Sequence, residues 1–386
     1  MLSNPPTTEL LFPNLCSLRC PYTPGSWHLL HLPFPSLTSL SLSVPKPHTF
    51  HDVLASFSEF SPNIKRISLK GYQFDIAFSK NISGRICHWR NLQTVYCPLI
   101  PLDADALLHL SRIPALTKLH FSPSATLPGS RSPLTFSNLH YITLRSESLE
   151  QISQFLCHIR LPAITNLNSI PTDCPSRQEL SSFLIGVQTS MAGNTIKRLR
   201  LRQPWHAHRK GLILGFEDLR PYMGFRNLRR IDLQIQWKVH LTESDLLTLT
   251  SAWPRLEKFY INSHVGWGTR SGITPNGLLQ LLRTCRSLTN IALVMDTRGY
   301  TEFLELPESL RLRSRHTLAI HVLDSYIEAE SVPAVAALFA AIAPRTDFTL
   351  SAWHSRLITD LQGWKEHQEL WDQVFRQAKD VVSQRS

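Results

Sequence analysis

The sequence is short of acidic residues. Against 40 lysines and arginines it has 29 aspartates and glutamates, which gives a formal net charge of +11. Charged residues make up 18% of the chain, less than the roughly one quarter of an average globular protein, whereas hydrophobic residues reach 42%. This balance excludes a largely disordered chain. The excess of positive charge favours acidic partners, but charge alone does not choose among acidic or phosphorylated protein segments, nucleic acid and an anionic membrane surface.

Long apolar runs are also missing. The most apolar stretch, Val332 to Ala343, contains Pro333 and is too short to cross a bilayer, so no membrane partner is expected. The N-terminus lacks the basic start and apolar run of a signal peptide. The seven cysteines include no Cys-x-x-Cys pair, and Cys20 and Cys97 occupy positions expected in the core. We therefore expect a cytoplasmic or nuclear protein with reduced cysteines.

Motifs of catalysis and cofactor binding are absent as well. The sequence has no Gly-x-Ser-x-Gly, P-loop, His-Glu-x-x-His or Gly-x-Gly-x-x-Gly pattern. His206 and His208 could supply two metal ligands, but no further ligand has a fitting spacing. Cys87 and His88 are adjacent, which in a strand would point their side chains apart. We predict that the protein is not an enzyme and holds no metal or cofactor.

What the sequence does have is a repeat. The pattern Leu-x-x-Leu-x-Leu, with Ile, Val, Phe or Cys as substitutes, starts at eleven positions spaced 22 to 32 residues apart. The starts are Leu15, Leu37, Ile64, Leu92, Leu116, Leu139, Ile164, Ile196, Leu228, Leu256 and Leu288. A period of this length with this apolar core is typical of leucine-rich repeats. Arrays of this kind offer extended binding surfaces, so the repeat favours binding over catalysis.

Each copy of the pattern predicts a short strand. Between Lys197 and Arg202, for example, Leu199 and Leu201 must point one way and the arginines the other. Stacked copies form a parallel sheet, and parallel neighbours need a crossover, for which helices are predicted. N-cap residues mark helix starts at Ser148, Ser176, Thr242 and Thr274, and further helices are predicted at residues 50–60 and 103–111.

The predicted fold class is therefore α/β, a leucine-rich-repeat solenoid of about 11–13 repeats. Its curved parallel sheet would form the concave face and its helices the convex face. After the last copy, alternation predicts two more strands, at residues 318–322 and 348–350. Residues 356–382 keep a helical spacing of apolar residues, which predicts an amphipathic capping helix. We expect the solenoid to span residues 1–355 and the capping helix to occupy residues 356–386.

The polar positions of the strands predict a basic surface. If the strands line the concave face, lysines and arginines gather there against one carboxylate, Asp232. The candidate partner-binding residues are Arg66, Lys70, Lys118, His120, Arg145, Arg198, Arg200, Arg202, Arg230, Lys258 and Tyr260. Because arginine forks pair well with phosphate and carboxylate, this surface suits an acidic or phosphorylated protein segment. The alternative is a merely solvated face, since every exposed strand position must be polar.

Two loops carry a tryptophan close to arginine. Trp205 follows the arginine-rich strand, and Trp267 lies in a similar loop further along. Exposed tryptophan near arginine is the composition of an interaction hot spot, so both residues join the candidate partner-binding set. The alternative is that each ring folds back onto the edge of the solenoid.

Short phrases in these repeats resemble the leucine-rich-repeat region of F-box proteins, in particular the large fungal set. The phrases are Phe34-Pro35-Ser36-Leu37, Ser61-Pro62-Asn63-Ile64, Trp89-Arg90-Asn91-Leu92 and Phe225-Arg226-Asn227-Leu228. In that family an N-terminal F-box binds Skp1, and the repeats present a substrate to a cullin-RING ubiquitin ligase. The resemblance thus implies a substrate-recognition module whose partner is a protein substrate.

The family pattern is incomplete in this sequence. The first repeat starts at Leu15, so we expect no F-box before it, and Skp1 and cullin are partners only if an F-box exists upstream. The alternative is a stand-alone leucine-rich-repeat scaffold or regulator with no link to a ligase. Nucleic-acid binding ranks third, since only the charge supports it. We expect a monomer.

Overall fold

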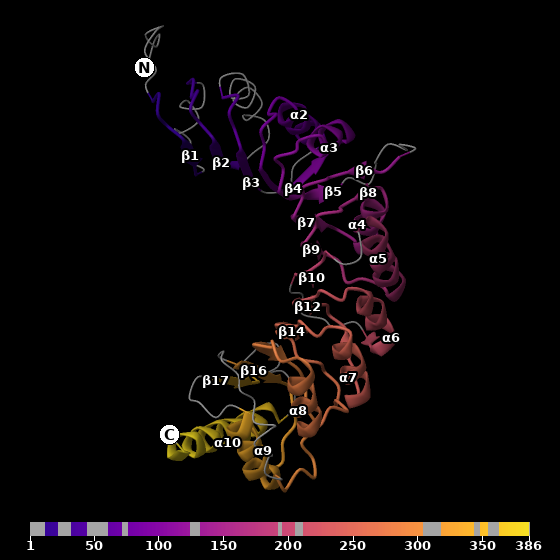
Figure 1. Ribbon diagram of the computed structural model, residues 1–386, viewed down its shortest axis with the longest axis vertical. Helices are drawn as coiled ribbons and strands as arrows, with labels where there is room; N and C mark the ends of the chain where they lie inside the picture. The colour runs from indigo at the N-terminus through magenta and orange to yellow at the C-terminus, as the bar shows by residue number, and fades with distance from the viewer. Residues whose placement is uncertain are drawn as a thin grey trace. The chain divides into compact units, whose positions relative to one another are not determined.

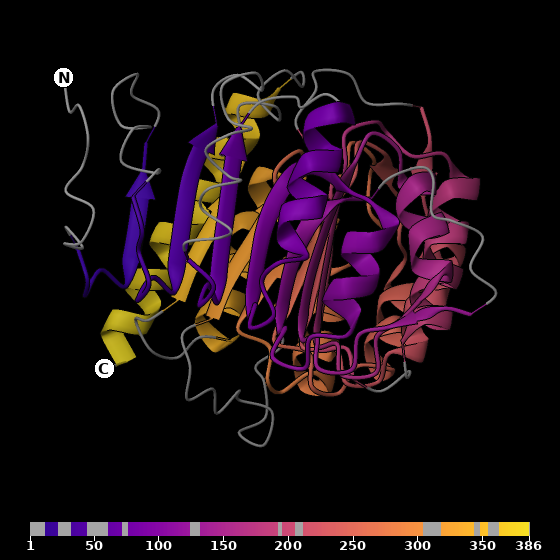
Figure 2. The same cartoon turned by 90° about the horizontal axis from the view of Figure 1, so that it is seen from above.

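The computed structural model describes residues 12–21, 32–44, 61–71, 76–123, 132–191, 195–204, 211–303, 318–342, 348–353 and 363–385. The chain divides into two compact units. The first comprises Met1–Thr172 and Ser182–Thr195, and the second comprises Asp173–Ser181 and Ile196–Ser386. In each unit one layer of parallel strands is backed by helices, as Figures 1 and 2 show.

Among its described residues, the first unit contributes seven strands in chain order to the large parallel sheet. They are β1 (Ser17–Cys20), β2 (Ser39–Val44), β3 (Arg66–Gly71), β4 (Thr94–Leu102), β5 (Lys118–Pro123), β7 (Tyr141–Ser146) and β9 (Asn166–Pro171). The register pairs equivalent positions of successive repeats, such as Leu40 with Ile67 and Leu119 with Ile142. The repeat positions taken from the sequence therefore match the register of the sheet, and their apolar side chains are buried, except Leu15 and Leu18 of the first repeat, which are half-buried.

Helices and two short strands complete the first unit. The helices are α2 (Ile76–Ile86), α3 (Ala104–Ser111) and α4 (Leu149–Cys157), and α5 (Arg177–Ser190) begins in the second unit and continues here. Strands β6 (Leu134–Thr135) and β8 (Ile159–Arg160) pair with each other. Cys87 and His88 follow α2 rather than lying in a strand, and His88 Nδ1 contacts Gly84 O at 3.0 Å.

The second unit continues the same design. Its parallel strands are β10 (Arg198–Arg202), β12 (Arg230–Gln234), β14 (Lys258–Ile261), β15 (Asn290–Ala292), β16 (Leu318–Leu323) and β17 (Phe348–Ala352), and β11 (Ile213–Leu214) pairs with β13 (Lys238–Val239). Its helical segments are α6 (Phe216–Leu219), η3 (Arg220–Gly224), α7 (Glu243–Ser251), α8 (Pro275–Thr284), η5 (Ala329–Ser331), α9 (Val332–Ile342) and α10 (Trp364–Arg385). The two strands predicted after the last repeat are confirmed as β16 and β17.

The helix starts predicted from capping residues are confirmed. Ser148 Oγ accepts a hydrogen bond from the Gln151 backbone N at 3.3 Å, and Thr274 Oγ1 accepts one from Gly277 N at 3.2 Å. At Ser176 and Thr242 the cap is reciprocal, because the acidic residue three positions on also accepts from the cap backbone. The helix predicted at residues 50–60 lies outside the described residues.

The C-terminal helix α10 packs on α9 through one apolar face. Trp371, Val374, Ala378 and Val382 are buried on that face. The indole Nε1 of Trp371 donates to Ser325 O at 2.9 Å, and Trp353 Nε1 donates to the same carbonyl at 3.0 Å. The helix predicted from residue 356 is seen from Trp364 onward, since residues 354–362 lie outside the described part.

Candidate functional site

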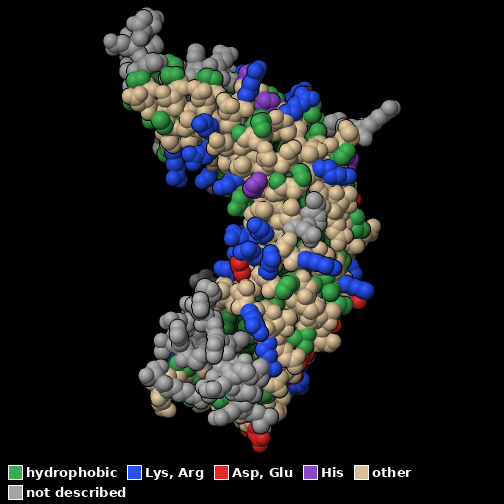
Figure 3. Space-filling view, in the orientation of Figure 1, with side chains coloured by type: hydrophobic (Ala, Val, Ile, Leu, Met, Phe, Trp, Pro, Cys, Tyr) green, Lys and Arg blue, Asp and Glu red, His purple; other side chains and the backbone are tan. Residues whose placement is uncertain are grey.

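Two neighbouring strands of the second unit bring four arginines together. In β10 the alternation buries Leu199 and Leu201 and leaves the arginines on the opposite face. The parallel register with β12 sets Arg198 beside Arg230, Arg200 beside Asp232 and Arg202 beside Gln234. Figure 3 shows Lys and Arg side chains gathered over this part of the strand face beside an acidic side chain.

Three of these arginines converge on one carboxylate. Asp232 is 1% exposed, and its Oδ2 accepts hydrogen bonds from Arg202 Nη2 at 2.7 Å and Arg230 Nη2 at 2.9 Å. Arg200 Nε lies 3.2 Å from the same oxygen, and Gln234 Nε2 donates to Oδ1 at 3.0 Å. We call Arg200, Arg202, Arg230 and Asp232 the arginine cluster. It holds three positive charges and one negative charge.

The charges of the cluster act on one another. Burial raises the pKa of Asp232, but hydrogen bonds from Arg202, Gln234 and Arg230 outweigh it, so the pKa lies below its usual value and the group stays ionised. Burial lowers the pKa of Arg200, and the positive charges of Arg230 and Arg202 lower it further. The carboxylate therefore does not compensate its neighbours fully, and repulsion among the guanidinium groups remains.

The cluster and the adjacent Gln234 also contain polar atoms without a partner. Among the described residues, the buried Nε atoms of Arg202 and Arg230 and Oε1 of Gln234 make no hydrogen bond. Leaving a buried donor or acceptor unpaired costs about 1–3 kcal/mol each, and more for a charged group. An anion that accepts from the two Nε–H groups would recover this energy.

An aromatic and a basic side chain continue the same face on β14. The guanidinium of Arg230 lies over the ring of Tyr260, 5.4 Å from its centroid. The register sets Lys258 beside Arg230 and Tyr260 beside Asp232. Gln234 is fixed by a second bond, from its Nε2 to Ser263 Oγ at 2.9 Å. The structure thus places Lys258 and Tyr260 next to the cluster, and their role in partner binding stays a prediction.

The other predicted basic residues belong to the strand face of the first unit. Arg66, Lys70 and Lys118 are exposed there, and Arg145 is half-buried. The ammonium of Lys70 lies 5.9 Å from the centroid of the Tyr96 ring, and that of Lys118 lies 5.2 Å from the Tyr141 ring. These are cation–π pairs that leave the charges open to solvent.

His120 is not a cation at neutral pH. Burial, and secondarily the charge of Arg145, lower its pKa from 6.5 to about 4. Its ring packs edge-on against Tyr96 with the centroids 4.4 Å apart, and its buried Nε2 makes no hydrogen bond. His120 therefore contributes an aromatic surface rather than positive charge.

The prediction that Trp267 is exposed is wrong. Its side chain is fully buried, and its Nε1 donates to Ile261 O at 3.0 Å. The loop folds inward because the buried carboxylate of Asp324 accepts hydrogen bonds from the backbone N of Trp267 and of Gly268, each at 2.7 Å. Trp267 is thus a core residue that cannot touch a partner, and Trp205 lies outside the described residues together with His206 and His208.

Asp232 and Gln234 are the site residues that the sequence reasoning missed. In the sequence, Asp232 stands out only as the single acidic residue of the predicted strand face. The signal was present, because aligning Leu199 with Ile231 by the repeat frame sets Asp232 next to Arg200. Only the fold shows that three arginines from two strands reach the same carboxylate oxygen.

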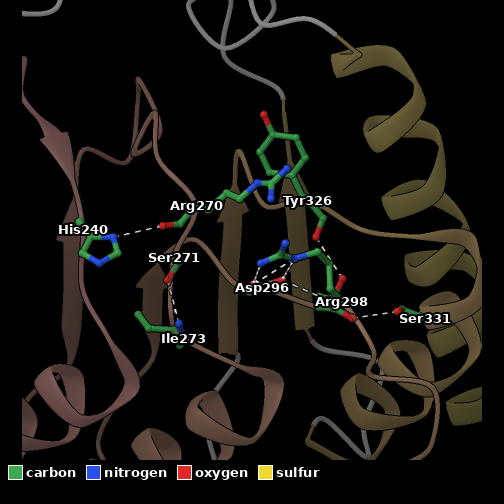
Figure 4. Close-up of polar contacts among 9 residues, drawn as sticks. His240, Arg270, Ser271, Ile273, Asp296, Arg298, Tyr326 and Ser331 are labelled. Carbon is green, nitrogen blue, oxygen red and sulfur yellow. Dashed lines mark hydrogen bonds and ion pairs between the residues drawn. The ribbon is translucent and has the colours of Figure 1, made fainter. Parts of the chain in front are cut away.

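A second group of polar residues lies in the loops after β13, β14, β15 and β16, and Figure 4 draws it. Arg298 pairs with Asp296, with Nη2 and Oδ2 2.5 Å apart, while the guanidinium of Arg270 lies 5.8 Å from the centroid of the Tyr326 ring. His240 Nδ1 contacts Arg270 O at 3.3 Å. Both arginines have a local partner, so this group joins neighbouring loops and offers less unsatisfied charge than the arginine cluster.

Neither a metal site nor a membrane span stands out in the part of the chain that the structure describes. No three histidine, cysteine, aspartate or glutamate side chains there are grouped so that they could hold a metal ion. Within the same residues, no helix combines the length and the apolarity needed to cross a bilayer.

Comparison with known proteins shows leucine-rich-repeat proteins at low similarity. No family model and no curated protein matches the chain. An internalin from Listeria monocytogenes is similar at 11% identity and a TM-score of 0.42, over 87% of this chain and 84% of the other. The leucine-rich repeat-containing protein LegL7 from Legionella pneumophila is similar at 12% identity and a TM-score of 0.33, over 94% of this chain and 98% of the other. The APL1 leucine-rich repeat domain is similar at 14% identity and a TM-score of 0.34, over 82% of this chain and 72% of the other.

These values carry no argument about partners. The assignment of the fold rests on the chain itself, whose repeats pair in register and bury their leucine positions. The protein is a leucine-rich-repeat solenoid of the α/β class.

Proposed function

We propose that the chain is a protein-interaction module that binds an acidic segment of a partner protein on the strand face of its second unit. The observation that carries this proposal is the arginine cluster, in which three guanidinium groups share one buried carboxylate. A purely structural ion pair would match its charges, whereas here two positive charges and two buried Nε–H donors remain for a ligand.

Binding of a labelled oligo-glutamate peptide, followed by fluorescence anisotropy, tests this function. The variant Arg198→Gln/Lys258→Gln removes two charges that flank Arg230 in the register and that make no ion pair with Asp232. The control Arg283→Gln/Arg286→Gln removes two charges from exposed positions on α8 and in the turn after it. We expect the strand-face variant to bind about three- to tenfold more weakly, and the control to bind as the wild type does.

Equal loss in both variants would show attraction to net charge alone, and unchanged binding in the strand-face variant would refute the proposed surface. Affinity should also fall as salt is raised, because the interacting charges are partly exposed.

The finer form of the proposal is that this face selects substrates for an F-box-type ubiquitin ligase. It is supported by the phrases shared with F-box proteins, such as Trp89-Arg90-Asn91-Leu92. A partner captured by the wild type but not by the strand-face variant should then accumulate in cells that lack this protein. If its level and its ubiquitination do not change, the module is a stand-alone scaffold.

A further inference from the structure

The arginine cluster is built to take a ligand with more than one negative charge. Arg200, Arg202 and Arg230 bring three positive charges to within 3.2 Å of one oxygen of Asp232. The carboxylate neutralises one of them, so two remain on side chains that are only 23–39% exposed. A single glutamate would leave one charge unbalanced, whereas a phosphate monoester near neutral pH carries up to two.

The unused donors fit the same ligand. In Arg202 and Arg230 an Nη atom donates to Asp232, while the buried Nε–H of the same guanidinium donates to nothing. A phosphoryl group has three terminal oxygens, so it can accept from both Nε–H groups at once. Lysine lacks the planar guanidinium, whose Nη and Nε groups would here bind Asp232 and the phosphoryl group at the same time.

Gln234 leaves a buried acceptor beside the arginine cluster, which favours a ligand that carries an N–H group. Its Nε2 is committed to Asp232 and Ser263, so its buried Oε1 is left as an acceptor beside the cluster without a donor. A complementary ligand therefore has an N–H close to its oxyanion. A peptide offers backbone N–H groups beside a phosphorylated side chain, whereas a phosphodiester backbone offers none.

We propose that the arginine cluster binds the phosphoryl group of a phosphorylated serine or threonine in a partner protein. This inference rests on the proposed function, which it narrows from acidic segments in general to phosphorylated ones. Asp232 acts as a positioning residue that holds three arginines against their mutual repulsion before the ligand arrives.

The test compares three peptide libraries on the immobilised full-length protein. The libraries share random flanks and differ at one fixed central residue, which is phosphoserine, serine or glutamate. We expect the phosphoserine library to be retained about tenfold or more over both others, as one or two additional charge-assisted hydrogen bonds imply. Retention should weaken from about pH 7 to about pH 5, because the phosphate takes up a proton near pH 6.

The variants Arg202→Lys and Arg230→Lys keep the charge beside Asp232 but remove the Nε–H. Each should reduce the preference for phosphoserine about tenfold. The control Arg283→Lys, at an exposed position of α8, should leave it unchanged. The wild-type comparison needs no variant, so it decides the question even if a substitution weakens the fold.

Equal retention of the phosphoserine and glutamate libraries would overturn this inference and leave the proposed function standing. Retention of neither would overturn both. Stronger binding of a labelled single-stranded oligonucleotide than of the phosphoserine library would also overturn it, in favour of nucleic acid.

Discussion

Replacing Asp232 with asparagine tests the electrostatic account of the arginine cluster. The change keeps the shape of the side chain but removes the negative charge that three arginines share. Breaking a buried ion pair by removing one partner costs about 3–5 kcal/mol. The arginine side chains are 23–39% exposed and keep part of their hydration, so we expect a smaller loss, about 2–3 kcal/mol.

Urea unfolding followed by tryptophan fluorescence measures this loss, since Trp237, Trp253 and Trp267 lie in the core of the second unit. The matched control is Glu257→Gln. Glu257, just before β14, pairs with Arg229, just before β12, at 3.0 Å, but the two side chains are 35% and 46% exposed. That control should cost no more than about 0.5 kcal/mol.

The difference in unfolding free energy between the wild type and Asp232→Asn should depend on pH in a defined direction. The pKa of Asp232 is lower in the folded protein than in the unfolded chain. Its contribution to stability is therefore complete when the pH is above the pKa of the unfolded chain, about 4. It is lost as the pH falls through the lower pKa of the folded protein. The gap between wild type and Asp232→Asn should close below about pH 4. A variant as stable as the wild type at neutral pH, or a difference in stability that stays constant into acid, would show that the charge of Asp232 does not stabilise the fold.

Two further predictions concern other parts of the fold. Gly266 has a φ of +70°, and a Cβ there would overlap the carboxylate of Asp324, so Gly266→Ala should lower the free energy of unfolding by about 3 kcal/mol in the same urea assay. The control is Gly299, which has a φ of +69° but open space around it. Gly299→Ala should therefore cost only about 1 kcal/mol. Equal costs would show that the contact with Asp324 is unimportant. The pKa of His120 is lowered to about 4 in the folded protein, so the unfolded chain binds a proton first as the pH falls. The free energy of unfolding should therefore fall between about pH 6.5 and 4, by about 3 kcal/mol. His120→Gln should lack that part of the pH dependence, and a parallel pH profile for both proteins would contradict the assignment.

The repeat frame could be predicted from the sequence because it depends on local chemistry. Leucine positions such as Leu199 and Leu201 must be buried, so their alternation defines both the strand and the face. Helix starts such as Thr242 were predictable for the same reason, since a capping side chain bonds to its own helix.

Contacts between repeats were harder to predict. The loop around Trp267 has the composition of an exposed hot spot. Nothing in the local sequence shows that Asp324, in a later repeat, holds this loop inward. The grouping of Arg202 and Arg230 on Asp232 likewise depends on side-chain directions across two strands. Sequence periodicity predicts which positions of neighbouring strands lie side by side, but not which of several arginine side chains reaches a shared carboxylate.

If the arginine cluster is a ligand site rather than a structural ion pair, a bound ligand must occupy its unused donors. Nuclear magnetic resonance of the arginine Nε–H groups, recorded while the phosphoserine peptide library is added, tests it most directly. We expect the Nε–H signals of Arg202 and Arg230 to shift as these donors bind the phosphoryl group, while the signal of Arg283 on α8 stays in place. Binding that leaves the Arg202 and Arg230 signals unmoved would contradict it.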